Sequence, residues 1–397
     1  MNFHTASFCA SAAIGLPTAP KISASLATGR FACRSERCLE TWTFRSPAIC
    51  LLAATPTRCT LTDTMDPSSD IILDTPFFRI YSDRRIDRLV GTDTVPAGFD
   101  PATGVTSKDV VLDSNSGLYV RLYLPDTATG SDHYSKKFPV LVYFHGGGFV
   151  THSAASPPYQ PFLNTLAAKA GLLIVSVNYR LAPEHPLPAG YEDSFRALKW
   201  AASGSGDPWL SHHGDLGRIF LAGDSSGGNF VHNVAMMAAA SELQIEGAVL
   251  LHAGFAGKQR IDGEKPESVA LTQKLWGIVC PEATDGVDDP RMNPLAAAAP
   301  SLRNLPCERV LVCAAELDSL RARNRAYYDA LAASGWGGTV EWLESKGKQH
   351  AFFLYDSGCG EAVELMDRLV AFFAGNLNSS CVDVTTHHTT TSGETLR

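Results

Sequence analysis

The chain has 397 residues, of which 45% are hydrophobic and 19% charged, as in an ordinary globular protein. A formal net charge of −8 offers no basic field for binding nucleic acid. No stretch approaches 18 consecutive apolar residues, so the sequence predicts no membrane span. This length accommodates one large α/β domain with additions, or two smaller domains.

The first 64 residues differ in composition from the rest of the chain. They are rich in Ser, Thr and Ala and contain six basic residues against three acidic ones. This composition is typical of an organelle transit peptide, and no apolar run near the start indicates a secretory signal. The alternative is that Met65 is the working start. The first interpretation predicts a plastid protein and the second a cytoplasmic one; in both, residues 1–64 are excluded from the predicted fold.

Ten cysteines are divided evenly between residues 1–64 and the remainder of the chain. None of them shows C-x-x-C spacing, and a chain of this size does not need disulfide staples. The sequence therefore predicts free thiols beyond residue 64, in a reducing compartment, and it predicts no zinc or other metal site.

From about residue 110, apolar runs alternate with helical patterns. Several runs are continuous in Val, Ile and Leu, as in strands covered on both faces. The predicted strands are 118–124, 138–144, 172–178, 218–222, 246–251, 309–314 and 339–343, and the predicted helices are 159–170, 192–202, 228–242, 321–334 and 361–376. This alternation predicts an α/β fold whose mainly parallel sheet carries helices on both faces. The first two strands have no helix between them, so we expect an antiparallel pair.

Two long segments do not fit this alternation. Residues 66–108 precede the sheet, and residues 255–305 lie between two strands. Long insertions in compact domains are usually lids or binding loops. We therefore expect both segments to contribute to a cap. Residues 377–397 have the polar composition of a disordered tail.

The strongest chemical signal is AGDSSGGN, residues 222–229. It contains the pattern G-x-S-x-G between a predicted strand and a predicted helix. That is the setting of a nucleophile elbow, a tight turn that exposes its serine hydroxyl above the sheet. The N-terminus of the following helix favours developing negative charge. The pattern predicts Ser225 as a nucleophile; the alternative is a glycine-rich turn without chemistry.

A serine nucleophile needs a base within hydrogen-bond reach and a third group that orients this base. After such an elbow, the acid comes next in the chain and the histidine comes last. His350 lies in a polar loop after the last predicted strand, whereas His232 lies within a helix and His252 comes too early. We therefore predict His350 as the base.

The predicted acid follows the strand 309–314. Asp318 lies beyond the strand end and has a short side chain that suits the orientation of an imidazole from a loop. Glu316 is the alternative, and we expect it to be a flanking hydrogen-bond or ion-pair partner. The predicted catalytic residues are Ser225, Asp318 and His350.

The stretch LVYFHGGGFV, residues 141–150, places three glycines after an apolar strand. When a serine attacks a carbonyl group, charge gathers on the oxygen, and N–H groups must already point toward it. Glycines leave no Cβ in the way and permit the angles that aim successive amides inward. We expect His145 to anchor this loop. The predicted oxyanion donors are Gly146, Gly147, Gly148 and Ser226.

Phosphate binding is the alternative use of these glycines. A phosphate-binding loop would continue with Lys and then Ser or Thr, and HGGGF does not. No dinucleotide-binding fingerprint is present either, so the sequence predicts no cofactor.

The motifs YFHGGGFV, NYRLAPEHPLPAGYED, AGDSSGGN and AELDSLR with QHAFF resemble those of the plant carboxylesterases of the hormone-sensitive-lipase type. The resemblance covers about residues 65–376. It implies an α/β-hydrolase fold there, with a mostly parallel eight-stranded sheet, helices on both faces and a cap from the N-terminal segment. It also implies Ser225, Asp318 and His350 as the triad, Gly147 above all among the oxyanion donors, and a small-molecule ester as substrate. The expected scaffold residues beside the site are Tyr179, Arg180, Pro183, Pro188, Tyr191 and Asp193.

The expected activity is that of a serine carboxylesterase on small to medium acyl esters, through an acyl-enzyme. The resembling family also includes 2-hydroxyisoflavanone dehydratases, which perform an elimination. Its tuliposide-converting enzymes carry a plastid-directing extension and use the same triad for intramolecular acyl transfer. The motifs are compatible with both alternatives. The related gibberellin receptor has serine at the third glycine and lacks the catalytic histidine, so Gly148 and His350 argue against a receptor.

Overall fold

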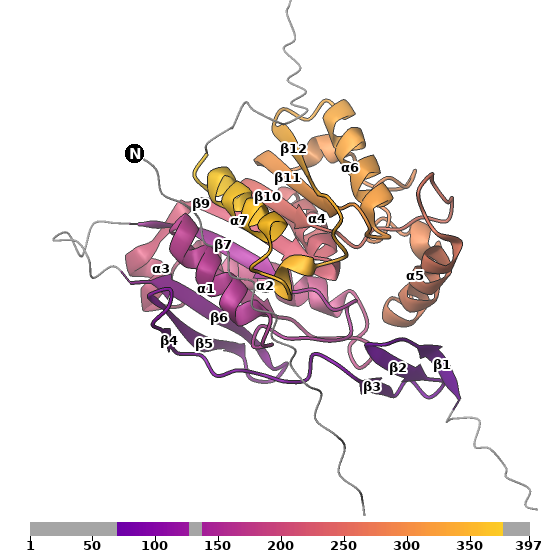
Figure 1. Ribbon diagram of the computed structural model, residues 1–397, viewed down its shortest axis with the longest axis horizontal. Helices are drawn as coiled ribbons and strands as arrows, with labels where there is room; N and C mark the ends of the chain where they lie inside the picture. The colour runs from indigo at the N-terminus through magenta and orange to yellow at the C-terminus, as the bar shows by residue number, and fades with distance from the viewer. Residues whose placement is uncertain (1–69, 127–136, 376–397) are drawn as a thin grey trace, which may run out of the picture. The chain divides into compact units, whose positions relative to one another are not determined.

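A computed structural model describes residues 70–126 and 137–375. The expectations for residues 1–64 and 377–397 lie outside these residues. Within them, one large sheet has nine strands in the order β12-β11-β10-β9-β7-β8-β6-β5-β4 (Figure 1). The strands are β4 Phe99–Asp100, β5 Val105–Asp113, β6 Leu118–Pro125, β7 Phe138–Phe144, β8 Leu173–Asn178, β9 Gly214–Asp224, β10 Ile245–Leu251, β11 Cys307–Ala315 and β12 Thr339–Ser345.

The sheet is mainly parallel, as predicted. Strands β7 to β12 pair in parallel, whereas β4, β5 and β6 form an antiparallel edge. Strand β6 runs antiparallel as expected, but its partners are β5 and β8 and not β7. The sheet has one strand more than the eight expected, the ninth being the two-residue β4.

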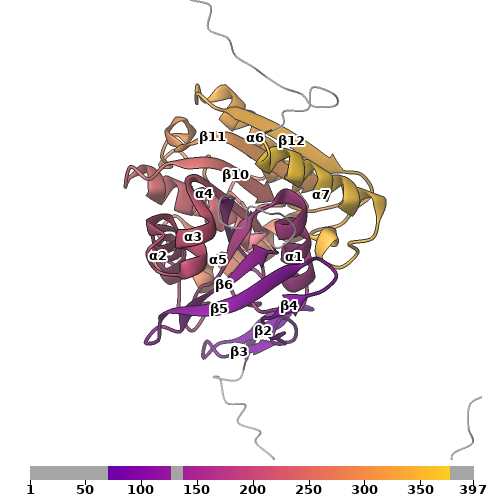
Figure 2. The same cartoon turned by 90° about the vertical axis from the view of Figure 1, so that its left-hand side faces the viewer.

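Helices cover both faces of the sheet. Because side chains alternate along a strand, Val140 and Val142 enter the core on one face, and Leu141 and Tyr143 enter the core on the other. Figure 2 shows α1 and α7 on the opposite side from α2 and α4. The helices are α1 Tyr159–Ala170, α2 Ala189–Ser203, α3 Pro208–His213, α4 Ser226–Ala239, α5 Pro266–Val279, α6 Arg321–Ala333 and α7 Gly360–Phe373, with short 3-10 turns η2 Gly286–Asp288, η3 Leu302–Asn304 and η4 Phe352–Leu354. Among these helices, none is both long and apolar enough to cross a bilayer.

The segment expected to form the N-terminal cap has two parts. A separate three-stranded antiparallel sheet comprises β1 Ile71–Asp74, β2 Phe78–Tyr81 and β3 Ile86–Arg88. Residues 99–100 and 105–108, however, belong to β4 and β5 of the main sheet, which corrects the assignment of all of 66–108 to the cap. The sequence of β5, VTSKDVVLD, lacks a continuous apolar run because this strand lies near the sheet edge and is only partly buried.

The two segments that depart from the strand–helix alternation, here called the insertions (66–108 and 255–305), are anchored beside the glycine loop, residues 145–150. Arg88 of β3 donates to the Val150 carbonyl (2.6 Å) and to both carboxylate oxygens of Glu184 (2.7 Å each). In the second insertion, buried Trp276 of α5 packs edge-on against Phe149, with ring centroids 5.9 Å apart.

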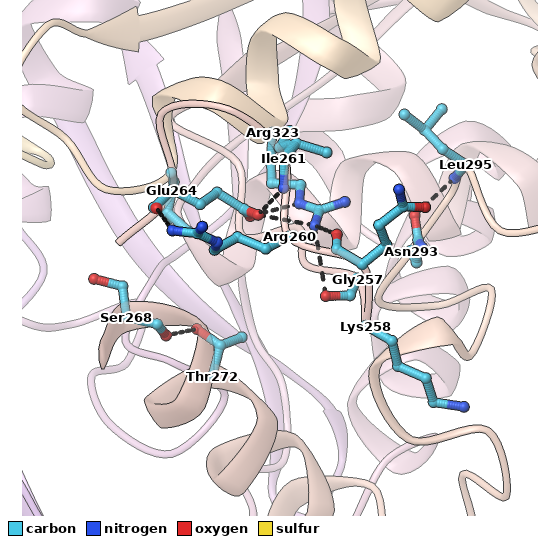
Figure 3. A network of polar contacts seen from close by, with 12 residues as sticks. Gly257, Lys258, Arg260, Ile261, Glu264, Ser268, Thr272, Asn293, Leu295 and Arg323 are labelled. Atoms are coloured by element: carbon cyan, nitrogen blue, oxygen red, sulfur yellow. Dashed lines mark hydrogen bonds and ion pairs between the residues drawn. The ribbon is translucent and has the colours of Figure 1, made fainter. Parts of the chain in front are cut away.

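The second insertion is also tied to α6 by a buried ion pair. Arg323 Nε lies 2.6 Å from Glu264 Oε1, and the two side chains are only 8% and 6% exposed. Glu264 also accepts from the Ile261 N–H at 2.8 Å (Figure 3). This pair holds the chain between β10 and α5 onto the main domain.

Candidate active site

Strand register brings the predicted site residues to one edge of the sheet. Phe144 is level with Gly223, Asp224 with Leu251, Leu251 with Cys313, and Ala315 with Ser345. The segments that follow these strand ends carry the glycine loop, Ser225, Asp318 and His350. In sheets of this kind, the carboxyl edge is where ligands bind.

The turn at Ser225 has the geometry of a nucleophile elbow. Ser225 has φ 55° and ψ −120°, a strained conformation for a residue with a side chain, between β9 and α4. A Cβ at Gly223 would collide with the Gly227 carbonyl, and a Cβ at Gly227 would collide with the Phe144 carbonyl. Both outer glycines of G-x-S-x-G are therefore sterically required. The predicted strand–turn–helix setting is confirmed, and the role of Ser225 stays a prediction.

His350 and Asp318 are directly hydrogen bonded. His350 Nδ1 lies 2.7 Å from Asp318 Oδ2, and Asp318 Oδ1 accepts from the Leu320 N–H at 2.9 Å. The Asp318 side chain is 2% exposed, whereas that of His350 is 37% exposed. A shielded carboxylate thus holds one nitrogen of an imidazole that remains accessible.

The pair also shifts two pKa values in opposite directions. Burial alone would raise the pKa of Asp318, but the hydrogen bond and charge of His350 lower it below its usual range. Burial alone would lower the pKa of His350, but the hydrogen bond and charge of Asp318, with the charge of Asp224, raise it above its usual value. The arrangement therefore stabilises an imidazolium, the form that a general base reaches during catalysis.

The glycine loop differs from the prediction at one position. The Gly146 N–H donates to Tyr159 Oη (2.8 Å) and to Asp224 Oδ1 (3.0 Å), so it is not available to an oxyanion. Within residues 70–126 and 137–375, by contrast, the N–H groups of Gly147 and Gly148 have no protein acceptor. Gly147 has φ 112° and Gly148 has φ 61°, angles that favour glycine.

Asp224 joins the elbow to this loop. Its carboxylate is buried and accepts from Tyr143 Oη at 2.9 Å and Tyr159 Oη at 3.1 Å, as well as from Gly146. Burial, opposed by these hydrogen bonds and by the charge of His350, raises the pKa of Asp224 to about 6. In the sequence, Asp224 is only a variable position of the elbow motif, so this contact was not predicted.

His145 anchors the loop as expected. It is fully buried, its Nδ1 lies 2.8 Å from the Gly146 carbonyl oxygen, and its ring stacks on Tyr179 with centroids 4.3 Å apart. Burial lowers its pKa to about 3, so the ring is neutral and is no base at neutral pH.

The NYRLAPEHPLPAGYED block contacts both the glycine loop and α4. Tyr179 Oη donates to the His145 carbonyl at 2.6 Å, and Tyr191 Oη donates to Asn229 on α4 at 2.7 Å. Arg180 makes two hydrogen bonds to Asp193, at 2.7 and 2.8 Å. The peptide bonds before Pro183 and Pro188 are cis. These contacts are those of a scaffold.

The remaining candidates lie in different surroundings. His232 packs within α4 as expected, with Nδ1 3.1 Å from Tyr327 Oη. Glu316 accepts from the Gly347 N–H at 2.8 Å, which makes it the expected flanking partner. His252, set aside for its place in the chain, is fully buried beside Asp318 and His350. The predicted free thiols are confirmed for the cysteines that the structure describes, Cys280, Cys307, Cys313 and Cys359.

One group of side chains could in principle hold a metal ion. His252, Asp318 and His350 each offer a ligand atom, and these atoms lie within 4.8 Å of one another. However, Nδ1 of His350 is bound to Asp318 and Nδ1 of His252 is bound to the Ala351 N–H. A metal at Nδ1 of either histidine would have to break these hydrogen bonds, so the arrangement fits a proton-transfer site better.

Known proteins share this fold and much of this sequence. Residues 141–354 match the family model of the α/β hydrolase fold. The chain is 48% identical to a probable tuliposide A-converting enzyme, amyloplastic, of Tulipa gesneriana, over 82% of this chain and 83% of that protein. It is 41% identical to probable carboxylesterase 2 of Arabidopsis thaliana, over 75% and 94% of the two chains. A solved thermostable carboxylesterase from a metagenomic library superposes with a TM-score of 0.58 at 27% identity, covering 72% and 92%.

The elbow, the sheet and the family match together define an α/β hydrolase. The identities to plant proteins narrow this class: the chain belongs to the plant carboxylesterase family.

Proposed function

We propose that this protein is a serine carboxylesterase in which Ser225 is the nucleophile, His350 the general base and Asp318 the residue that orients it. The observation that carries the proposal is the hydrogen bond between His350 Nδ1 and Asp318 Oδ2 at the sheet edge where Ser225 occupies a strained elbow. Because Asp318 holds Nδ1, Nε2 of His350 is the nitrogen left to exchange protons with the serine.

The proposed reaction has two halves. Ser225 Oγ attacks the ester carbonyl while His350 takes the hydroxyl proton, and His350 then gives this proton to the departing alcohol. Water, deprotonated by His350, attacks the resulting acyl-enzyme and releases the carboxylic acid and the free serine. Asp318 stabilises the imidazolium in both halves and keeps its own charge.

The proposed oxyanion donors are the amides of Gly147, Gly148 and Ser226. The free N–H groups of the two glycines and the position of Ser226 at the start of α4 support this assignment. Each donor of this kind contributes about 10²–10³ in rate.

Apolar side chains from both insertions favour a small to medium acyl group. A Cβ placed on Gly148 would lie 3.6 Å from Leu275 Cδ2 of α5 and 3.9 Å from Phe78 Cε1 of β2. Both insertions therefore approach Gly148, where the acyl carbonyl would bind. This limits the space for the ester and makes its surroundings apolar.

Intramolecular acyl transfer is the second candidate, because the identity to the tuliposide A-converting enzyme is 48% over most of both chains. In that reaction a hydroxyl of the acyl group, and not water, attacks the acyl-enzyme carbonyl and forms a lactone. Mass spectrometry of the products from a hydroxy-acid ester separates the two, since hydrolysis gives the free acid and transfer gives the lactone.

We also propose a plastid location, with residues 1–64 as the transit peptide. The amyloplastic and chloroplastic relatives support this proposal. Sequencing of the mature N-terminus from tissue tests it: a terminus within the first residues of the chain, or synthesis from Met65 alone, would contradict it.

Activity-based labelling tests the catalytic assignment. Wild type should hydrolyse p-nitrophenyl acetate and react with a fluorophosphonate probe, and Ser225→Ala should do neither. Ser203→Ala, in an exposed serine at the end of α2, is the matched control and should behave as wild type. Full labelling of Ser225→Ala would overturn the nucleophile assignment, and ligand binding without labelling of wild type would indicate a receptor.

A further inference from the structure

A buried histidine that the proposed reaction does not use lies next to His350. His252 follows β10, and its side chain has no solvent exposure. Its Nδ1 lies 2.9 Å from the backbone nitrogen of Ala351 and 3.8 Å from Asp318 Oδ2. One imidazole thus contacts the residue after His350 and approaches the carboxylate that holds His350.

The hydrogen bond from Ala351 determines where His252 carries its proton. A backbone N–H can only donate, so Nδ1 of His252 accepts, and the proton of the neutral ring is on Nε2. Burial, with a smaller contribution from the neighbouring His350, lowers the pKa of His252 to about 3. The ring therefore stays neutral when His350 takes a proton, and it does not donate to Asp318 in competition with His350.

Ala351 occupies a conformation that its surroundings must hold. Its φ is 51°, in the left-handed region where a residue with a Cβ is strained. Such conformations persist where neighbouring contacts over-determine them, and they cluster at functional sites. The His252 ring supplies these contacts, through the Ala351 N–H and through packing on Phe352 and Phe353 at centroid distances of 6.0 and 5.6 Å.

We infer that His252 is a positioning residue for the catalytic base. By accepting the Ala351 N–H, its Nδ1 fixes the peptide plane between His350 and Ala351, and with it the direction of the His350 side chain toward Asp318. His252 touches no reacting atom and acts through Ala351 alone. The inference rests on the proposed function, because it presumes that His350 is the base.

Three substitutions at His252 separate the effect of its hydrogen-bond acceptor from the effect of its ring shape. His252→Asn keeps an acceptor the same number of bonds from Cα as Nδ1, His252→Gln moves it to the position of Nε2, and His252→Phe removes it. Since His252 itself has φ 51°, Asn suits the backbone well. We expect kcat of His252→Phe on p-nitrophenyl acetate to fall about 10²-fold with little change in KM, as for a base that is slightly misplaced. His252→Asn should recover most of kcat, and His252→Gln should not.

The matched control is His232→Phe. His232 is also a buried histidine whose Nδ1 is hydrogen bonded, here to Tyr327 on α6. This variant should lose stability while its kcat per folded molecule stays at the wild-type value. In proton NMR, the low-field signal of the hydrogen bond between His350 and Asp318 should broaden in His252→Phe and remain sharp in His252→Asn and His232→Phe.

Equal kcat per folded molecule for wild type and His252→Phe would overturn the inference, as would equal kcat for the Asn and Gln variants. If His252→Phe does not fold, the comparison of kcat between His252→Asn and His252→Gln still tests the inference. Ser225→Ala, labelled in the same experiment, keeps the two proposals apart. Labelling of Ser225→Ala contradicts the proposed function itself, whereas an inactive Ser225→Ala beside a fully active His252→Phe contradicts only the role of His252.

Discussion

Substitution of Asp224 by Asn should have opposite effects on stability and on catalysis. The Asp224 carboxylate is 2% exposed and receives three hydrogen bonds, two of them on Oδ1, from Tyr143 (2.9 Å) and Gly146 (3.0 Å). Its pKa is nevertheless raised to about 6, because burial outweighs the hydrogen bonds. An Asn side chain keeps an oxygen for Tyr143 and Gly146 and carries no charge.

The effect on stability follows from the difference in pKa between the folded and unfolded states. An unfolded aspartate has a pKa of about 3.9, so the folded protein binds the proton more tightly. The free energy of unfolding therefore falls as pH rises from about 4 to about 6 and is level above that range. At about 1.36 kcal/mol for each pH unit between the two pKa values, the loss is roughly 3 kcal/mol in all. About half of this loss falls between pH 5 and pH 7.5.

Urea unfolding at pH 5 and pH 7.5, followed by tryptophan fluorescence, measures this difference. Asp224→Asn should lose on the order of 1 kcal/mol less than wild type between the two pH values. The substitution also removes the hydrogen bond from Tyr159, which costs about 1 kcal/mol. We therefore expect Asp224→Asn to be no less stable than wild type at pH 7.5. An unchanged difference between the two pH values would refute the reasoning.

The effect on catalysis has the opposite sign. Burial lowers the pKa of His350, and the charges of Asp318 and Asp224 together raise it. The base acts in its neutral form, so kcat/KM falls as pH drops through this pKa, which lies above the ordinary value of about 6.5. Removal of the Asp224 charge should move this fall in kcat/KM to lower pH. It should also lower the kcat/KM reached at high pH. Asp318→Asn should move the fall further. A fall that moves to higher pH in Asp224→Asn would contradict the assignment.

Two other substitutions test the glycine loop and the anchor of the second insertion. Gly147→Ala places a Cβ against the Thr151 carbonyl at φ 112° and should lower kcat on p-nitrophenyl acetate by about 10²–10³-fold. The control is Gly117→Ala, at φ 73° with no atom within 4 Å of the added Cβ. It should strain the backbone and leave kcat unchanged. Arg323→Met leaves Glu264 buried without its partner and should lower the free energy of unfolding in urea by about 3–5 kcal/mol. Asp329→Ala, from an exposed pair, should lower it by less than about 1 kcal/mol.

The parts of the fold that the sequence predicts well are those with a single strong pattern. Buried parallel strands are continuous apolar runs, so β7 was predicted with the bounds that it has, and α1 likewise. Strand β5 was missed because polar and apolar residues mix along a strand near the sheet edge. The predicted partner of β6 was wrong for a different reason. Proximity in the chain suggested β7, but the chain passes through α1 after β7 and returns as β8, which lies between β7 and β6 in the sheet.

The candidate site, like the fold, was predicted well where one local pattern marks a residue and poorly where contacts between separate elements decide its role. Motif letters located the elbow and the glycine loop, because Gly223 and Gly227 are required by local sterics that any such turn imposes. They could not reveal that the Gly146 amide is already bound to Asp224 and Tyr159, since that contact joins three separate elements. His252 was set aside by chain order, yet sheet order places β10 between the strands that precede Ser225 and Asp318. Spatial order of the strands was the signal that could have found it.

Backbone strain links His252 and Ala351 to the predicted nucleophile. Ser225, His252 and Ala351 have φ values of 55°, 51° and 51°, each strained by about 1–3 kcal/mol. They are connected, because the Ser225 N–H donates to the carbonyl of Leu251, which precedes His252, and the His252 ring accepts from Ala351. Strand β10 thus holds both the nucleophile turn and the histidine loop, although it supplies no residue of the proposed triad. The relative position of Ser225 and His350 therefore depends on a strand that no catalytic motif marks, and substitutions at its carboxyl end should affect catalysis more than its sequence suggests.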